Sequence, residues 1–182
     1  DFGRIAAQTA KQVVVQRIRE AERDILFDDY NDRAGEIITG VVERYEGRTI
    51  YISLGKIEGV LPTSEQMPMD QYRVGERMKY YVVEVKKTTK TPHVLLSRTH
   101  PGLLRKLFEL EVPEIAEGVV EIKSVAREAG YRSKVAVSSK QDNVDPVGAC
   151  VGHRGSRVQA VVDELRGEKI DIVRWSPESS HY

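Results

Sequence analysis

Residues 145–158 read DPVGACVGHRGSRV, and this stretch decides how the last part of the chain folds. Runs of small and apolar residues flank a break at 152–155, where two glycines frame a histidine and an arginine. Asp145 is a favoured helix cap and Pro146 fits a first helical turn, so the sequence predicts a short helix. This helix is expected to stop at Gly152, with the break forming a tight turn after it.

A second helix is expected directly after the break. Ser156 and Gln159 have the spacing of a capping box, which is typical of a helix start. Gly167 is expected to end this helix. Its predicted buried stripe consists of Val158, Val161, Val162 and Leu165. A short helix near 103–108 and strands near 119–125, 134–138 and 169–173 complete the segment. The predicted order is therefore helix, strand, strand, helix, helix, strand.

The residues of the break are typical of a phosphate site. Gly152 and Gly155 lack the Cβ atoms that would keep a nucleic-acid backbone at a distance. The amides at the start of the second helix lie at the positive end of its dipole, where an anion is stabilised. Arg154 and Arg157 add cationic donors for phosphate oxygens, and His153 is either a further donor or loop filler. A simple helix-turn-helix would explain the glycines equally well.

Other residues near the break are expected to complete a nucleic-acid site. The apolar surface around Val147, Val151, Val158 and Ile170 is predicted to floor a groove for bases. Arg132 and Lys134 flank the second strand on one face, where they either reach the nucleic-acid backbone or form the basic surface of an edge strand. The predicted contacts in this segment are Val151, Gly152, His153, Arg154, Gly155, Ser156, Arg157, Arg132 and Lys134.

A different hydrophobic period runs from Gly35 to about Arg98. Residues 49–54 alternate strictly, with Ile50 and Ile52 on the opposite face from Tyr51. Further strand candidates lie at 36–42, 58–61, 77–85 and 93–97, separated by glycine and proline turns. Five short strands in one segment favour a small β-barrel.

Exposed side chains on this predicted barrel are candidates for binding single-stranded nucleic acid. Tyr51 is either a platform for base stacking or an ordinary exposed tyrosine of a strand. The loop between the last two strands is either part of a binding face or a solvated hairpin. The predicted contacts in this segment are Tyr51, Arg48, Lys86, Lys87, Lys90 and His93.

The first part of the chain has helical periodicity. Apolar residues recur at spacings of three, four and seven from Phe2 to about Leu26, which predicts one long amphipathic helix. Such a helix needs a partner to cover its apolar stripe, and that cover is expected in sequence before Asp1. The chain is thus expected to be an α+β, multidomain piece of a longer protein. The expected divisions are a connector helix at 1–34, a barrel at 35–101 and a segment of helices and strands, of α+β class, at 102–182.

The barrel segment resembles a known family. The glycines at 35 and 40, ISLG at 52–55, EGVLP at 58–62 and VLLS at 94–97 are similar in order and spacing to the S1-type OB fold, an RNA-binding barrel. Arg48 stands where that family often has a second aromatic residue, and Pro62 stands where a histidine is common.

The last segment resembles a KH domain of type II, whose GxxG loop clamps about four nucleotides of single-stranded RNA. REAGYRSKVAV at 127–137, DPVGACVG at 145–152 and GEKIDI at 167–172 are very similar to the first KH domain of the NusA family of bacterial transcription factors. Ala129 replaces a proline often found in that motif. The long helix, the barrel and the KH segment agree in order with that family.

This resemblance implies a cytoplasmic factor that binds nascent RNA and RNA polymerase. Such a factor modulates pausing, termination and antitermination. In that family the domain before the long helix makes most of the polymerase contact, and most of that domain is not in this chain. Other antitermination factors are expected as further partners.

Composition excludes several other classes. The chain of 182 residues carries 28 basic and 28 acidic side chains, so bulk positive charge does not drive nucleic-acid binding. No apolar run approaches the roughly 20 residues of a membrane helix, and no signal peptide is recognisable. Cys150 is the single cysteine, so no internal disulfide is expected. Its apolar neighbours favour inert packing over catalysis, and the four histidines show no metal-ligand spacing, so neither an enzyme nor a cofactor is predicted.

Two alternatives to a transcription factor are open at this point. S1-type barrels followed by KH domains also occur in the cap subunits of RNA-degrading exosomes. A protein-binding adaptor on the same scaffold would also suit the neutral net charge.

Overall fold

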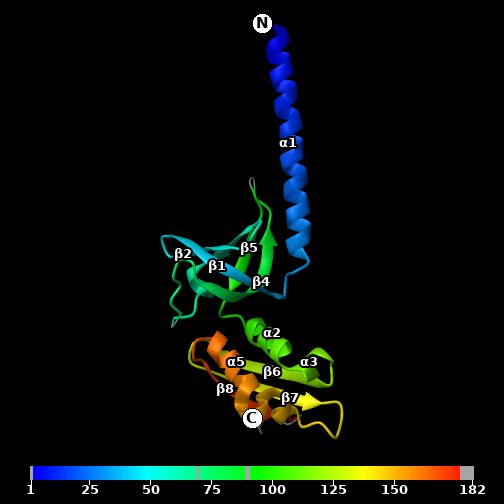
Figure 1. Ribbon diagram of the computed structural model, residues 1–182, viewed down its shortest axis with the longest axis vertical. Helices are drawn as coiled ribbons and strands as arrows, with labels where there is room; N and C mark the ends of the chain where they lie inside the picture. The colour runs from blue at the N-terminus through cyan, green and yellow to red at the C-terminus, as the bar shows by residue number, and fades with distance from the viewer. Residues whose placement is uncertain (1, 69, 89–90, 177–182) are drawn as a thin grey trace.

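The computed structural model describes residues 2–68, 70–88 and 91–176. They form a long helix, a closed β-barrel and a carboxyl-terminal domain of helices and strands (Figure 1). The barrel lies between the helix and the carboxyl-terminal domain. Lys90 and residues 177–182, to which the sequence predictions extend, lie outside the described residues. The predicted α+β class and the order of its parts are confirmed.

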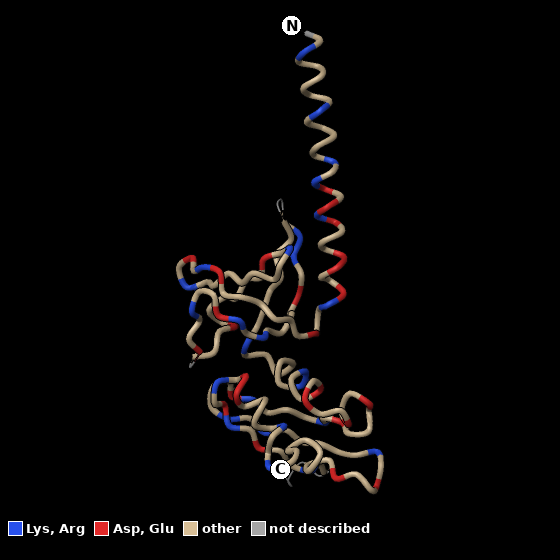
Figure 2. Tube along the Cα trace, in the orientation of Figure 1, with Lys and Arg blue, Asp and Glu red and all other residues tan. Residues whose placement is uncertain are grey.

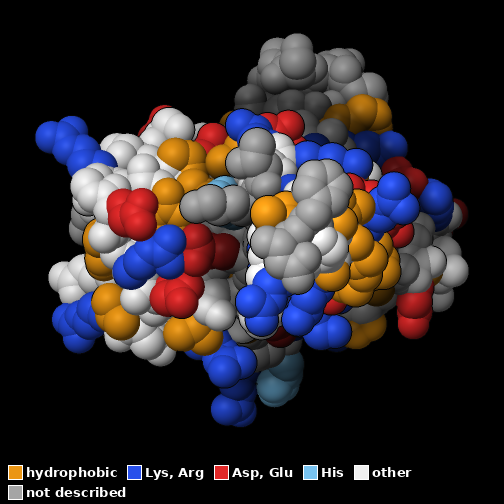
Figure 3. Space-filling view, turned by 90° about the horizontal axis from the view of Figure 1, so that it is seen from above, with side chains coloured by type: hydrophobic (Ala, Val, Ile, Leu, Met, Phe, Trp, Pro, Cys, Tyr) orange, Lys and Arg blue, Asp and Glu red, His pale blue; other side chains and the backbone are white. Residues whose placement is uncertain are grey.

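The long helix α1 (Phe2–Asn31) projects away from the barrel, and only its last turns pack against it. Leu26, Phe27 and Tyr30 contact the barrel core, and the Tyr30 hydroxyl donates to the carbonyl of Leu54 at 3.3 Å. Along the rest of the helix the predicted stripe is exposed; Ile5, for example, is 63% exposed. In the space-filling view from above, Figure 3 shows hydrophobic side chains exposed at the molecular surface next to basic ones.

Charge is unevenly distributed along α1. The charged residues in the outer half of the tube in Figure 2 are all basic, and all of the acidic residues of α1 lie in the half next to the barrel. Among the described residues, no helix combines the length and apolar character that a membrane crossing requires.

The barrel has the strand order β1-β2-β3-β5-β4 and is closed. Its neighbours pair antiparallel, except that β3 and β5 are parallel. The 3₁₀ turn η1 (Thr63–Glu65) follows β3. The strands are β1 (Ile37–Glu46), β2 (Thr49–Ser53), β3 (Glu58–Leu61), β4 (Arg77–Lys86) and β5 (His93–Ser97). The inward-facing residues are buried, as the alternation of Ile50 and Ile52 predicts, and they form one hydrophobic core.

The carboxyl-terminal domain packs helices on one face of a three-stranded sheet with the order β6-β7-β8. Strands β6 and β7 pair antiparallel, whereas β7 and β8 pair parallel. The elements are α2 (Pro101–Glu111), α3 (Pro113–Ala116), β6 (Val120–Glu128), β7 (Arg132–Ser139), α4 (Pro146–Val151), the 3₁₀ turn η2 (His153–Gly155), α5 (Ser156–Glu164) and β8 (Lys169–Arg174). The predicted order of helices and strands is confirmed. The short helix α3 is an addition, because four residues are too few to show a helical period.

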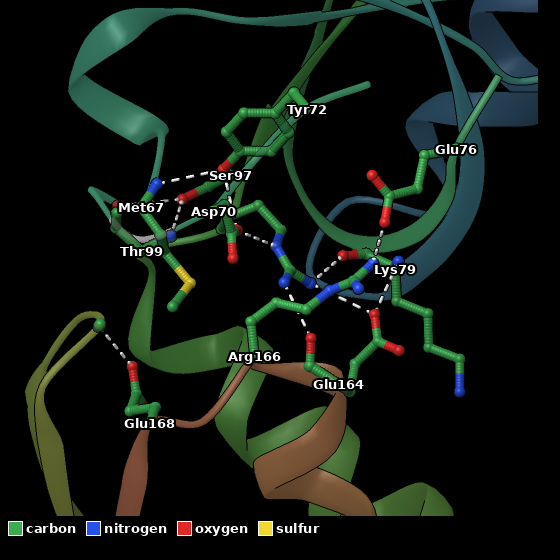
Figure 4. A network of polar contacts seen from close by, with 12 residues as sticks. Met67, Asp70, Tyr72, Glu76, Lys79, Ser97, Thr99, Glu164, Arg166 and Glu168 are labelled. Carbon is green, nitrogen blue, oxygen red and sulfur yellow. Dashed lines mark hydrogen bonds and ion pairs between the residues drawn. The ribbon is translucent and has the colours of Figure 1, made fainter. Parts of the chain in front are cut away.

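A buried polar network, here called the joint, connects the barrel to this domain (Figure 4). The Arg98 guanidinium is fully buried and donates to Asp70 Oδ2 at 3.0 Å, to the carbonyl of Lys79 at 2.9 Å and to the carbonyl of Glu164 at 2.8 Å. Arg127 donates in turn to the carbonyl of Arg98 at 2.8 Å and pairs with Glu168. These contacts fix α5 and β6 against the end of the barrel.

Candidate nucleic-acid interface

The backbone at Gly152 explains why α4 ends there. Gly152 has φ 79° and ψ 177°, a region that is essentially restricted to glycine. A Cβ atom at this position would lie 2.9 Å from the backbone nitrogen of Arg157 and 2.6 Å from its Cγ atom. The turn itself and close packing on Arg157 therefore both require glycine at position 152.

The second glycine of the turn meets a different requirement. Arg154 has φ 56° and Gly155 has φ 75°, so both adopt the left-handed conformation. A Cβ atom at Gly155 would meet only the Cγ1 atom of Val158, at 3.9 Å. The space beside Gly155 is thus open, and a bound backbone is able to approach it closely.

The turn is open to solvent. His153, Arg154 and Ser156 are exposed, and no side chain caps the first turn of α5. The amide of Gly155 donates to the carbonyl of Gly152 at 3.2 Å, and the amide of Ser156 donates to the carbonyl of His153. Amides in the first turn of a helix generally lack an intrahelical acceptor, so the next amides of α5 are candidate donors. They are the backbone donors proposed to meet an anion at this corner.

The predicted capping box is wrong. Ser156 has helical dihedral angles, φ −62° and ψ −38°, and Gly155 is the residue at the cap position. The helix begins at Ser156 because the 3₁₀ turn of η2 leads directly into it. Ser156 therefore presents its exposed side chain beside the turn and does not close the end of the helix.

Arg157 does not have the free guanidinium that its predicted role as a phosphate donor assumed. Its Nη1 atom donates to Glu114 Oε2 at 2.8 Å and to the carbonyl of Ala149 at 2.7 Å. Sequence reasoning missed this arrangement because Glu114 belongs to the unpredicted helix α3.

The apolar residues proposed as the floor of a groove lie together. Val147 of α4, Val158 of α5 and Ile170 of β8 are half-buried against the same core, and Val151 at the end of α4 is half-buried too. These four residues, here called the apolar strip, are each partly accessible to solvent.

The structure separates Arg132 and Lys134 from the turn. Ser133, Val135 and Val137 are buried on the face of β7 that the helices cover. Because side chains alternate along a strand, the exposed Arg132 and Lys134 lie on the opposite face of the sheet. β7 is also the middle strand and not an edge strand.

On the barrel, Tyr51 is half-buried and one face of its ring is already covered. The Arg44 guanidinium lies 4.3 Å from the ring centroid. Glu58 holds this guanidinium by two hydrogen bonds of 2.7 and 3.0 Å, and Glu46 adds one of 3.1 Å. Hydrogen bonding to Arg44 lowers the pKa of the Glu58 carboxyl. Arg44 was missed because a β-bulge between Val42 and Arg44 places it directly across from Tyr51, and a simple alternation does not reveal bulges.

The other predicted barrel contacts do not converge on one site. Tyr51 and His93 line the same surface pocket of about 510 Å³. Lys86 is exposed and pairs with Glu84, while Arg48 is exposed in the turn between β1 and β2. The ammonium group of Lys87 instead contacts α1, at 3.7 Å from Asp24 and 4.7 Å from the centroid of the Phe27 ring.

Cys150 lies in the domain core and not in a reactive setting. It is buried, and burial raises the pKa of its thiol to about 11. The thiol is therefore protonated at neutral pH, which favours packing over nucleophilic chemistry. In the described parts of the chain, no three His, Cys, Asp or Glu side chains gather as metal ligands.

Comparison with known proteins covers most of the chain. The family model of the NusA N-terminal domain matches residues 1–24, that of the S1 RNA binding domain matches 31–96, and that of the NusA-like first KH domain matches 98–175. Three similar curated proteins are each named transcription termination/antitermination protein NusA. That of Halalkalibacterium halodurans is 63% identical over 182 residues, that of Bacillus subtilis 61% over 178, and that of Thermus thermophilus 48% over 183.

These alignments cover 100%, 98% and 100% of this chain and 48%, 48% and 47% of the three relatives, in the same order. The chain therefore spans about half the length of the curated relatives it matches.

Proposed function

This chain belongs to the NusA family, and from that premise we propose that it binds single-stranded nascent RNA and modulates pausing, termination and antitermination by RNA polymerase. The names of the relatives support a role in termination and antitermination. Two of the three matched family models describe NusA domains, which favours this role over that of a subunit of an RNA-degrading complex. The proposed location is the bacterial cytoplasm, where nascent RNA is made.

One observation carries the RNA-binding proposal: the exposed turn at 152–155 joins α4 to an uncapped α5 in a backbone shape that leaves the space beside Gly155 open. In the proposed complex, a phosphate lies against the first amides of α5, and Arg154 and His153 donate to its oxygens. The adjoining bases lie on the apolar strip formed by Val147, Val151, Val158 and Ile170.

The barrel has a secondary part in this proposal. Tyr51 and His93 share a pocket, but Arg44 occupies one face of the tyrosine ring. A base that stacks there has to use the remaining face or displace a guanidinium that carboxylates hold. We therefore assign the main RNA contact to the KH domain. Binding of RNA polymerase and of other antitermination factors is proposed from family membership, with the region that matches the NusA N-terminal domain as the polymerase-facing end.

Titration of fluorescently labelled single-stranded RNA at increasing salt tests this proposal. A loop that contacts three or four phosphates of a single strand gives a slope of log K against log salt of about −2 to −3. The affinity should then fall about 20- to 50-fold between 50 and 200 mM salt. No binding at 50 mM salt would contradict RNA binding and would favour an adaptor that recognises proteins.

A further inference from the structure

We propose that Arg157 and Glu114 form a brace that holds the turn at 152–155 in its RNA-binding shape, so that Arg157 is a positioning residue and not a phosphate ligand. This inference rests on the proposed function of the turn. It assigns an indirect role in RNA binding to α3, because Glu114 of α3 accepts a hydrogen bond from Arg157.

The brace connects three helices through one guanidinium. Arg157 lies in the first turn of α5, and its Nη1 atom donates to the carbonyl of Ala149 at 2.7 Å. Ala149 lies in the last turn of α4, where carbonyls lack intrahelical donors. The same nitrogen donates to Glu114 of α3 at 2.8 Å. The end of α4 is thereby tied to the start of α5 across the turn.

The aliphatic part of the Arg157 side chain also packs against the turn, at Gly152. A Cβ atom on Gly152 would lie 2.6 Å from the Cγ atom and 2.9 Å from the Cβ atom of Arg157. The Gly152 backbone therefore packs directly on this side chain. Arg157 thus contacts the turn at Gly152 and the preceding helix at Ala149. These two contacts together fix the position of the left-handed residues Arg154 and Gly155.

Helix α3 is a firm anchor for the other end of the brace. Val112, directly before α3, is fully buried, and the carbonyl of Glu114 accepts a hydrogen bond of 2.9 Å from the amide of Val119. The side chains of Arg157 and Glu114 are each 31% exposed, so the pair lies at the surface of the domain core. A left-handed non-glycine residue such as Arg154 persists where its surroundings hold it, and the brace provides that support.

The brace predicts an effect opposite to that of simple electrostatics. Glu114 is an anion close to the proposed phosphate site, so removing its charge should strengthen RNA binding if only long-range attraction matters. If Glu114 instead fixes Arg157, its removal loosens the turn and weakens RNA binding. The sign of the change therefore separates the two explanations.

The experiment compares Glu114→Gln with Glu117→Gln, which removes the same charge from an exposed residue at the end of α3. Binding of labelled single-stranded RNA is measured at several salt concentrations, and circular dichroism checks that each variant is folded. Glu114→Gln is expected to weaken binding several-fold, because the amide oxygen of Gln accepts a weaker hydrogen bond from Arg157 than the carboxylate does. Glu117→Gln should leave affinity unchanged or raise it slightly. Equal or tighter binding by Glu114→Gln would overturn the brace.

Arg157→Gln provides an independent readout. A positioning residue should lower the affinity without changing the salt slope, whereas loss of a phosphate contact reduces the slope by about 0.7. A slope reduced by that amount would overturn the assignment of Arg157 as a positioning residue. A double variant of the exposed turn, His153→Asp with Arg154→Asp, is measured in parallel. Unchanged RNA affinity of that variant would show that the proposed function itself is wrong, and the brace would fall with it.

Discussion

Replacing both His153 and Arg154 with Asp is expected to weaken binding of single-stranded RNA by about 100-fold or more. Both side chains are exposed at the turn, where the structure gives them room to reach a phosphate. A hydrogen bond to a charged group contributes about 1.5 to 3 kcal/mol, so losing two such donors accounts for a 100-fold change. The introduced carboxylates additionally repel phosphates. Fluorescence anisotropy with a labelled RNA measures the change.

This prediction requires a control for net charge. The double change replaces a histidine and an arginine with two anionic residues. Gln12→Glu with Arg19→Glu makes the matching change on the exposed part of α1, far from the turn, with residues that favour helices. The circular dichroism of both variants should equal that of the parent. If the turn variant loses no more affinity than the α1 variant, the turn is not the RNA site.

Replacing Arg98 with Met is expected to lower the free energy of unfolding by about 3 to 5 kcal/mol. The side chains of Arg98 and Asp70 are both fully buried, so this change leaves a buried carboxylate without its cation. It also leaves the carbonyls of Lys79 and Glu164 without their donor. Urea denaturation followed by circular dichroism measures the loss.

Two further variants test whether the joint is the cause. Arg73→Met removes an arginine from an exposed loop of the barrel and should cost less than about 1 kcal/mol. Combining Arg98→Met with Asp70→Asn removes the unpaired charge and should recover part of the lost stability. A loss for Arg98→Met no greater than that for Arg73→Met would contradict the view that this network holds the barrel and the KH domain together.

The features that sequence patterns predicted well are those that repeat locally. Alternation placed two of the barrel strands, because inward-facing residues such as Ile50 and Ile52 recur every second position, and the glycine and proline turns located the other three. The helical period placed α1, and the glycines at 152 and 155 located the turn between α4 and α5. In each case neighbouring residues carry the signal, so one stretch of chain is sufficient.

The features that sequence patterns did not predict depend on contacts between distant residues. Arg98 meets Glu164, and Arg157 meets Glu114, only after the domain has folded. Lys87, a candidate RNA contact or part of a solvated hairpin by sequence, contacts α1, and Arg44 reaches Tyr51 through a bulge. A charged side chain in a sequence does not reveal which partner will neutralise it. The candidate RNA contacts on the barrel were therefore less predictable than its strands.

Backbone amide NMR during addition of single-stranded RNA is the most direct test of the central claim, that the first turn of α5 and the preceding glycine-framed loop hold the phosphates. The amide signals of Gly155 to Val158 are expected to shift most, together with those of the apolar strip at Val147 and Ile170. Large shifts confined to the barrel around Tyr51 and His93, with the signals from 152–158 unmoved, would contradict it.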